Sequence, residues 1–386
     1  MILTQCAVCA TPLPHPRLQC GICKTPYCGR DCQKLHWKGG HRALCPQIKR
    51  GGGAEQYHAN NKYAEAVAEA AEACADDTKG QTCYICTQAL HWKTKEGLVR
   101  GCSCRGTAGF AHVSCLAEQA KILVADAEAN NLNDKANEGW RRWFQCSLCE
   151  QRYHGVVICA LGWACWKTYV CRPKTDPNHR SAYPLLSNGL LETGRKTEAL
   201  AVFEARLAMQ RSLGPRYCGT EEIVASEDGI ATLYNSLGMY EEGLKMKRDI
   251  YARRVALHGD SHSASLEAAT ALVQSLVQVG KFLEAKNFLR ELIPVARRVW
   301  GRESDQWLRQ QWMYGNVLCE EGSAPTLDDL VEGVKVLEAV EKSWVRVMGA
   351  RHPETPRMQS SLKKAQAKLA VASLEERISA FENSES

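Results

Sequence analysis

The sequence has no run of apolar residues as long as the about 18 that a membrane-spanning helix requires. The best candidate, Val156–Trp166, is too short and is interrupted by Gly162. The first residues, Met1–Cys6, lack the basic stretch and the apolar core of a secretory signal. Charged residues make up 24% and hydrophobic residues 45% of the chain, a mixture that excludes a disordered protein. We therefore expect a soluble intracellular protein, cytoplasmic or nuclear, without a membrane partner.

Cysteine is what the sequence has in abundance, with 20 in 386 residues. Fourteen of them lie in two clusters, at residues 6–45 and 83–149. In a chain without a secretory signal, clustered pairs of cysteines indicate metal binding rather than disulfides. The other six are isolated, and we expect Cys159, Cys165 and Cys171 to be buried among aromatic residues.

The first cluster contains eight potential zinc ligands, many of them in pairs separated by two residues. They are Cys6, Cys9, Cys20, Cys23, Cys28, Cys32, His41 and Cys45. Eight such ligands match two tetrahedral zinc sites. A segment of about 45 residues is near the size at which a hydrophobic core alone no longer suffices. Two closed sites would therefore stabilise the fold, and they leave no open position for catalysis.

The stretch Tyr27–Trp37 resembles a MYND zinc finger, a family whose two metal sites interleave. The resemblance implies one site made by Cys6, Cys9, Cys28 and Cys32, and another made by Cys20, Cys23, His41 and Cys45. It also implies a groove for short proline-containing peptides, lined by Gln33 and Trp37. Alternatively, Trp37 covers the small core. Residues 1–50 are basic, and we interpret this as a solvated face in preference to an attraction for acidic or phosphate-bearing partners.

The second cluster has seven cysteines and one histidine. They are Cys83, Cys86, Cys102, Cys104, His112, Cys115, Cys146 and Cys149. The stretch Gly101–Leu116 resembles a RING-CH (RING-variant) domain. The resemblance implies one zinc site made by Cys83, Cys86, His112 and Cys115, and another made by Cys102, Cys104, Cys146 and Cys149. The long insert between Leu116 and Gln145 is expected to continue as a helix through Ala129.

Four structural Zn²⁺ ions change the charge of the chain. A site with four thiolates carries about −2, and a site with three thiolates and a neutral imidazole carries about −1. Two sites of each kind cancel the formal net charge of +6. The net charge of the zinc-loaded chain therefore does not favour nucleic acid as a partner.

A RING-CH domain performs no covalent chemistry, and the resemblance implies that it docks a ubiquitin-conjugating enzyme and positions its ubiquitin thioester. Ile85, between the first two ligands, fits the docking role. Gln119, Ser147 and Glu150 stand where related domains often have a Trp, a Pro and a basic residue. Two hypotheses remain open. One is a soluble RING-CH-type ubiquitin-protein ligase that selects targets through its other modules. The other is a non-catalytic, zinc-stabilised adaptor or scaffold that binds peptide motifs.

A seven-residue motif recurs in the second half of the chain, as Gly194–Leu200, Gly238–Leu244 and Gly280–Lys286. Each copy is followed by an amphipathic stretch and a residue pair that ends in glycine: Leu213–Gly214, His258–Gly259 and Trp300–Gly301, with Met348–Gly349 after a degenerate fourth copy at Thr326–Leu337. The pattern predicts a pair of helices in each unit, and stacking such pairs buries their apolar faces. In the fourth copy, Asp328 and Asp329 supply the helix start.

The boundary His258–His262 resembles that of the tetratricopeptide (TPR) repeats of kinesin light chains, as does Met348–Pro353. This resemblance implies a solenoid that binds protein or peptide targets. The fold class is then mostly α, with two small zinc-stabilised cross-brace fingers before an α-solenoid of helix pairs. The expected divisions are a first finger at 1–48, a linker (Lys49–Gly53) and helix (Glu55–Ala75) at 49–80, a second finger at 81–155, a connecting segment at 156–178 and repeats at 179–380.

Overall fold

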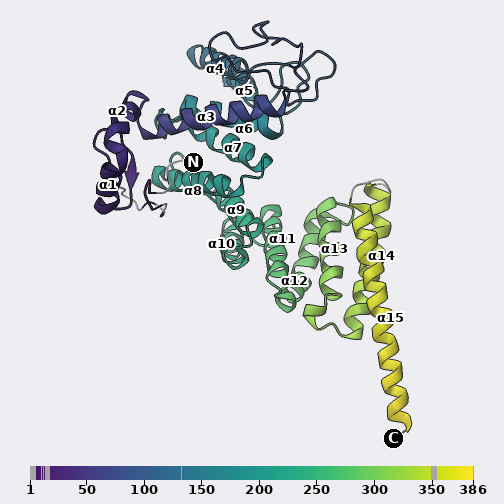
Figure 1. Ribbon diagram of the computed structural model, residues 1–386. Coiled ribbons are helices and arrows are strands. Elements are labelled where there is room, and N and C mark those ends of the chain that lie inside the picture. Colours follow the sequence, from purple (N-terminus) through teal and green to yellow (C-terminus); the bar gives the residue numbers. More distant parts are fainter. Residues whose placement is uncertain are drawn as a thin grey trace. The chain divides into compact units, whose positions relative to one another are not determined.

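The computed structural model describes residues 6–9, 11, 13, 18–131, 133–348 and 354–385. The chain divides into two compact units, Met1–Ser226 and Glu227–Ser386. Helices predominate in both units (Figure 1), so the predicted mostly-α fold is confirmed. Within the described part of the chain, no helix combines the length and the apolar character needed to cross a bilayer. We call residues 6–45 the first finger and residues 83–149 the second finger.

The first finger is built around two short antiparallel strands followed by a bent helical segment. Its elements are β1 (Leu18–Gln19), β2 (Pro26–Tyr27), α1 (Arg30–His36), the π-helical turn η1 (Trp37–His41) and α2 (Arg42–Arg50), which runs past its end. Leu18 pairs with Tyr27. Tyr27 is fully buried among the metal-ligand cysteines, and Ile48 closes this small core from α2.

The segment Lys49–Gly53, predicted as a flexible linker, comprises the last two residues of α2 and a hydrogen-bonded turn at Gly51–Gly53 that precedes α3 (Ala54–Ala73). The backbone amide of Ala54 donates a hydrogen bond to the carbonyl of Cys23 at 2.8 Å. Gly53 has a φ of 95°, a conformation that glycine adopts without the strain of a Cβ atom. The glycines therefore turn the chain sharply, and the turn attaches the first finger to α3.

The centre of the first unit is α6 (Gly155–Tyr169), which is buried on nearly every side. It packs against α3, α4 (Val113–Ala129) and α7 (Pro177–Glu192). A helix that is apolar all round has to be buried, and three neighbouring helices supply that burial. The close contact of α7 with α6 depends on Gly189, because a Cβ atom there would lie only 2.7 Å from the Cα of Cys159 in α6.

The remaining helices follow in sequence. In the first unit these are α5 (Asn133–Arg141) and α8 (Lys196–Leu213), and α9 (Thr220–Ser236) includes the boundary between the units. The second unit continues with α10 (Tyr240–His258), α11 (Ser263–Gln278), α12 (Phe282–Trp300), α13 (Asp305–Leu318), the short 3₁₀ helix η2 (Glu321–Ser323), α14 (Leu327–Met348) and α15 (Thr355–Glu385). The helix in the insert ends at Ala129 as predicted, whereas α5 was not anticipated.

The recurring glycines mark the helix ends that the repeat pattern predicted. Gly214, Gly259 and Gly301 follow directly on the last residues of α8, α10 and α12. Consecutive helices pack together, including α7 with α8, α11 with α12 and α13 with α14. The predicted pair of helices per repeat is thus present in these units. Gly349, the corresponding glycine of the fourth copy, lies outside the described residues.

The cores of the second unit consist of aliphatic and aromatic side chains. Trp307 is 8% exposed and Trp344 is fully buried, while Trp300 and Trp312 pack against the same cluster from its edge. Trp307 and Trp344 are core residues, as the sequence predicted, whereas Trp300 and Trp312 are half-buried at the edge of the core.

The degenerate fourth copy replaces the glycine turn by a buried ionic network. The ammonium group of Lys286 donates to a carboxylate oxygen of Asp329 at 2.6 Å, and both side chains are almost completely buried. Thr326 donates to the same carboxylate through its amide and its hydroxyl. Burial acts to raise the pKa of Asp329, but the hydrogen bonds from Lys286 and Thr326 hold that pKa at about 2. Asp329 therefore links α12 to the start of α14.

Candidate metal centres and partner surfaces

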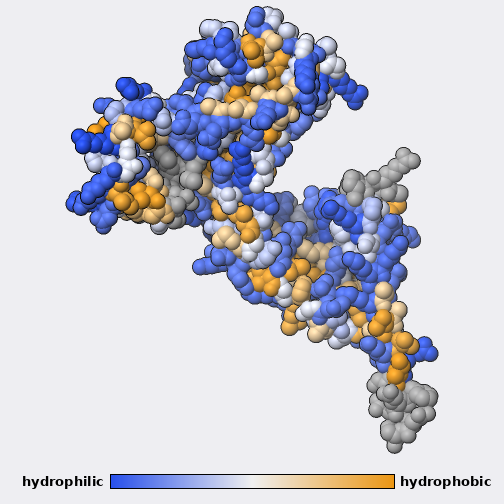
Figure 2. All heavy atoms as spheres, in the orientation of Figure 1, coloured by the Kyte–Doolittle hydropathy of each residue, from blue (hydrophilic) through white to orange (hydrophobic). Residues whose placement is uncertain are grey.

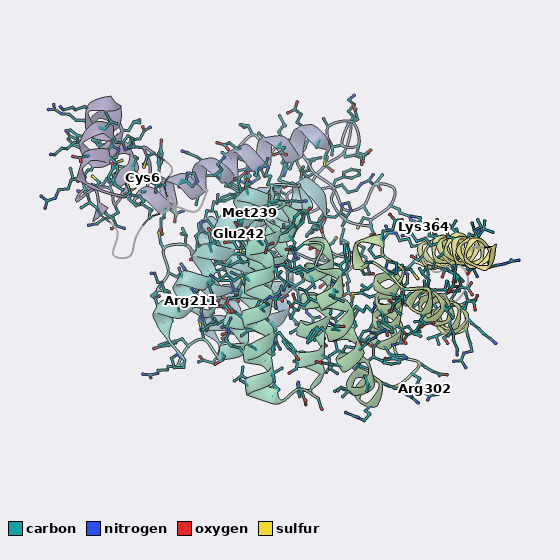
Figure 3. The ribbon with its side chains drawn as sticks, turned by 90° about the horizontal axis from the view of Figure 1, so that it is seen from below. Cys6, Arg211, Met239, Glu242, Arg302 and Lys364 are labelled. Carbon is teal, nitrogen blue, oxygen red and sulfur yellow. The ribbon has the colours of Figure 1, made fainter. Side chains whose placement is uncertain are left out.

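The structure brings together four sets of four ligand side chains. In each set, the potential ligand atoms lie within 4.8 Å of one another. The sets are Cys6, Cys9, Cys28 and Cys32; Cys20, Cys23, His41 and Cys45; Cys83, Cys86, His112 and Cys115; and Cys102, Cys104, Cys146 and Cys149. They are the sets that the two resemblances implied. Figure 3 shows Cys6 inside the first finger, in the lilac part of the ribbon.

The distances between sulfur atoms fit a tetrahedron around one zinc ion. Zinc–sulfur bonds of about 2.3 Å place the sulfurs of a tetrahedral site about 3.8 Å apart. The Sγ atoms of Cys20 and Cys45 are 3.8 Å apart, as are those of Cys104 and Cys146. A disulfide would hold its sulfurs at about 2 Å, and the described cysteines are all free. The four clusters therefore fit four zinc ions.

Each finger has one site that contains a histidine. The Nε2 atom of His41 lies 3.3 Å from the Sγ of Cys23, and the Nδ1 atom of His112 lies 3.4 Å from the Sγ of Cys86. The other ring nitrogen of His112 lies 3.3 Å from the carbonyl oxygen of Ala89, a contact that orients the ring toward the thiols. Burial lowers the pKa of both imidazoles, which favours the neutral form that binds zinc.

Local hydrogen bonds also favour the thiolate form of some ligands. The Sγ of Cys9 lies 3.2 Å from the hydroxyl of Thr11, and hydrogen bonding with Thr11 lowers the pKa of Cys9 to about 6. Burial acts to raise the pKa of Cys149, but hydrogen bonds from the backbone of Gln151 and from Cys104 bring it to about 7. The thiolate is the form that binds zinc, so these positions are prepared for the metal.

The cysteines outside the clusters have no metal-site geometry in the described residues. Cys159 and Cys165 are buried within α6 as predicted. Cys171 was expected to be buried but is exposed, because it follows the end of α6, and its Sγ lies 3.2 Å from the side-chain oxygen of Gln56.

Two exposed apolar residues lie on adjacent zinc-ligand loops of the second finger. Ile85 is 37% exposed, and Leu148 is 51% exposed. The two loops are joined by a hydrogen bond of 3.1 Å between the hydroxyls of Tyr84 and Ser147. Sequence reasoning selected Ile85 but missed Leu148. The signal was present, since each is the second residue between a pair of cysteines separated by two positions.

The residues proposed to bind peptides lie on the helical part of the first finger. Gln33 is half-buried in α1, and Trp37 at the start of η1 is 39% exposed. The ring of Trp37 meets the ring of the zinc ligand His41 edge-on, with centroids 5.9 Å apart. Trp37 thus covers part of the metal site and still presents a surface to solvent. His36, which we did not include among the ligands, packs between the hydroxyl of Tyr27 and the ring of His41.

The second unit has a groove of about 440 Å³ between α11 and α13. Its lining mixes polar and apolar side chains, among them Thr270, Gln274, Trp312, Met313 and Asn316. The groove lies on helices that occupy equivalent places in successive repeats, so it is a feature of the stacking itself.

The comparisons with known proteins agree with the geometry of the fingers. Residues 6–45 match the family model of the MYND finger, and residues 83–149 match that of the RING-variant domain. No curated protein shows a significant match to the chain.

Solved structures with repeated helices also resemble the chain. One is a kinesin light chain structure with nearly identical TPR-like repeats from Podosopora anserina, at 15% identity and a TM-score of 0.41, covering 62% of this chain and 98% of that one. Another is BtubC from P. vanneervenii, at 12% identity and a TM-score of 0.35, covering 70% and 92%. Residues 6–45 thus match a MYND finger and residues 83–149 a RING-variant domain, and the four ligand sets agree with a zinc-binding interaction protein.

Proposed function

We propose that this protein is a ubiquitin-protein ligase whose second finger docks a ubiquitin-conjugating enzyme. The observation that carries the proposal is the pair Ile85 and Leu148, two exposed apolar side chains on neighbouring loops. The loops are fixed at both ends by ligand cysteines and joined by the contact of Tyr84 with Ser147. Apolar side chains held in this way form a preorganised docking surface, which binds without a cost for ordering loops.

In this proposal the second finger makes and breaks no covalent bond. It accelerates ubiquitin transfer by holding the thioester-linked ubiquitin in a reactive orientation, a positioning effect. Positioning requires a rigid base, and the helices provide one. The hydroxyl of Tyr63 in α3 lies 2.9 Å from that of Ser114, next to the ligand Cys115. The ammonium of Lys167 in α6 lies 3.4 Å from the centroid of the same tyrosine ring.

Target selection is assigned to the other modules. The first finger offers Gln33 and Trp37 for a short peptide, as its likeness to the MYND family implies. The groove between α11 and α13 offers a second place for an extended peptide segment. We assign this activity to the cytoplasm or the nucleus, where a reducing environment keeps cysteine ligands free of disulfides.

A second candidate function is that of an adaptor that binds partners without supporting ubiquitin transfer. It is favoured by Glu150, which is acidic and exposed directly after the last ligand. Many RING domains have a basic residue there that contacts ubiquitin. Gln119, half-buried on α4, stands at another position where related domains often have a larger apolar residue. Both substitutions weaken the contacts expected of a ligase.

The test is self-ubiquitination of the full zinc-loaded chain with a panel of ubiquitin-conjugating enzymes. Ile85→Ala and Leu148→Ala should each reduce the rate at least tenfold with whichever enzyme is active. Leu90→Ala is the matched control, because Leu90 is 59% exposed in the same finger but lies outside the ligand pairs. If the wild type showed no self-ubiquitination with any enzyme, the ligase hypothesis would be excluded and the adaptor hypothesis would remain.

A further inference from the structure

Three cations form a row along the exposed side of the helical segment of the first finger. Arg30, Lys34 and Lys38 follow one another at intervals of four residues, which places neighbours on the same side of a helix. All three are exposed, and none forms an ion pair or a side-chain hydrogen bond with another described residue. Like charges at this spacing destabilise a helix. The finger therefore keeps a repulsive arrangement that its own acidic residues do not neutralise.

The charge around the row is strongly one-sided. Residues 18–50 contain seven lysines and arginines and a single acidic residue, Asp31. The two zinc sites of this finger would contribute a charge of about −3, which leaves a net charge of about +3. The ligand Cys32 is two residues from Arg30, which corresponds to about 200° around the helix, so this thiolate faces away from the row. The positive charge is thus directed to solvent.

An apolar contact surface lies directly beside the row. Trp37 precedes Lys38, and Gln33 precedes Lys34, so the residues proposed to bind peptides flank the cations along the same helical face. Leu35 is 61% exposed on the other side of the row. Figure 2 shows hydrophobic surface bordered by hydrophilic surface at the left, over the region of α1 and α2.

We propose that the first finger selects acidic peptides: an apolar side chain of the bound segment contacts Trp37, and flanking carboxylates pair with Arg30, Lys34 and Lys38. This inference rests on the proposed binding of peptides by the first finger and adds the charge of the ligand. It replaces our interpretation of the basic residues as a solvated face, because the structure places three of them in one row beside Trp37. Charge complementarity is the argument for this occupant. A nucleic acid fits less well, because Tyr27 and Trp37 are the only Tyr, Trp or Phe in residues 1–50 and Tyr27 is buried, whereas single strands stack on several aromatic rings.

The experiment measures binding of fluorescent nine-residue peptides to the full zinc-loaded chain at low salt. The first peptide has a central Pro-Leu pair flanked on each side by two glutamates, and the second has glutamines in place of the glutamates. Wild type should bind the glutamate peptide about tenfold more tightly, since three exposed ion pairs of ordinary strength give a preference of that order. The preference should shrink to about twofold in 0.5 M salt.

The double variant Lys34→Gln and Lys38→Gln should lose the preference without a lower midpoint of thermal unfolding, because it removes only a repulsive pair. The matched control is Lys49→Gln with Arg50→Gln, which removes the same charge from the end of α2 and should keep the preference. An equal loss in both double variants would overturn the proposal, because net charge alone would then explain the binding.

Further outcomes separate this inference from the proposed function. Equal binding of both peptides by wild type would overturn the preference for acidic ligands and leave peptide binding intact. Binding of neither peptide would instead contradict the peptide site itself. A single-stranded DNA oligomer that binds more tightly than the glutamate peptide, and does so through Lys34 and Lys38, would assign the row to nucleic acid and also overturn the proposal.

Discussion

The fingers and the repeat helices of the second unit are held together by different interactions. In the first finger, four of the seven buried members of the core cluster are the ligands Cys6, Cys20, Cys23 and Cys45. In the second unit, the main cluster consists of aliphatic and aromatic residues such as Leu244, Leu272, Leu289 and Tyr314. A short segment cannot bury enough apolar surface, so metal ligands occupy the place of a core. Stacked helix pairs bury each other's faces and need no metal.

The largest effect expected from this difference is that of zinc removal. A strong chelator should unfold both fingers and leave α10 to α14 folded, because structural zinc supplies about 10–16 kcal/mol in small modules, as much as the whole stability of many domains. Hydrogen exchange read by mass spectrometry should show lost protection in residues 18–50 and 83–115, with protection kept in α11 and α13. Equal loss of protection in α11 and α13 would contradict the comparison.

Two fully buried cysteines allow the same comparison within one residue type. Cys23 belongs to a ligand set, whereas Cys165 lies in α6 outside all four sets. Cys23→Ser should reduce the zinc content from four ions per chain to three and expose the first finger to proteolysis. Cys165→Ser should keep four ions and destabilise the chain by about 1–3 kcal/mol, because it buries a hydroxyl among apolar groups. Metal analysis and thermal unfolding of both variants distinguish the two roles.

A third test concerns packing without metal in the first unit. Gly189→Ala should destabilise the contact of α6 with α7 by up to about 3 kcal/mol, because the new Cβ would lie 2.7 Å from a backbone atom of Cys159. Gly219→Ala is the control, since a Cβ there has open space and the substitution should change stability by less than about 0.5 kcal/mol. Urea unfolding of the zinc-loaded chain measures both. Equal midpoints for the two variants would show that this helix crossing contributes little to stability.

The same difference explains how much of the molecule could be predicted from its sequence. Zinc ligands occur at characteristic short spacings, and the family resemblances implied the same four sets of ligands that lie together in the structure. The helix ends of the repeats follow from glycine, whose backbone freedom acts locally. Both kinds of feature depend on short stretches of sequence and can therefore be predicted from it.

Features that depend on distant partners were missed. The turn before Ala54 is fixed by the carbonyl of Cys23, about thirty positions away in the chain. The docking loops of the second finger are joined by Tyr84 and Ser147, whose separation is 63 residues. Asp329 lies in the first turn of α14, as predicted, and exchanges hydrogen bonds with Thr326 there. Its ion pair with Lys286, 43 residues earlier, was not predicted. Nothing in the local sequence identifies such pairs.

That last pair supports the smallest predicted effect, a dependence of the repeat packing on pH. The carboxyl group of Asp329 has a pKa of about 2 in the folded chain, and an unfolded aspartate has a pKa of about 3.9. Its stabilisation of α12 against α14 is therefore complete above about pH 4 and is lost as the pH falls through about 2, by about 2 kcal/mol in total.

Hydrogen exchange of α12 and α14 at pH 5 and pH 2.5 measures this effect apart from the fingers, whose zinc ligands also become protonated in acid. Wild type should lose protection in these helices on acidification. Asp329→Asn should have lower protection at pH 5 and lose less on acidification, because its amide leaves the buried Lys286 without a counter-charge at either pH. Asp328→Asn, a change at the exposed neighbouring position, should behave as wild type. If the Asp329→Asn variant lost as much protection on acidification as the wild type, packing of apolar side chains, and not the ionic pair, would join the fourth repeat to the third.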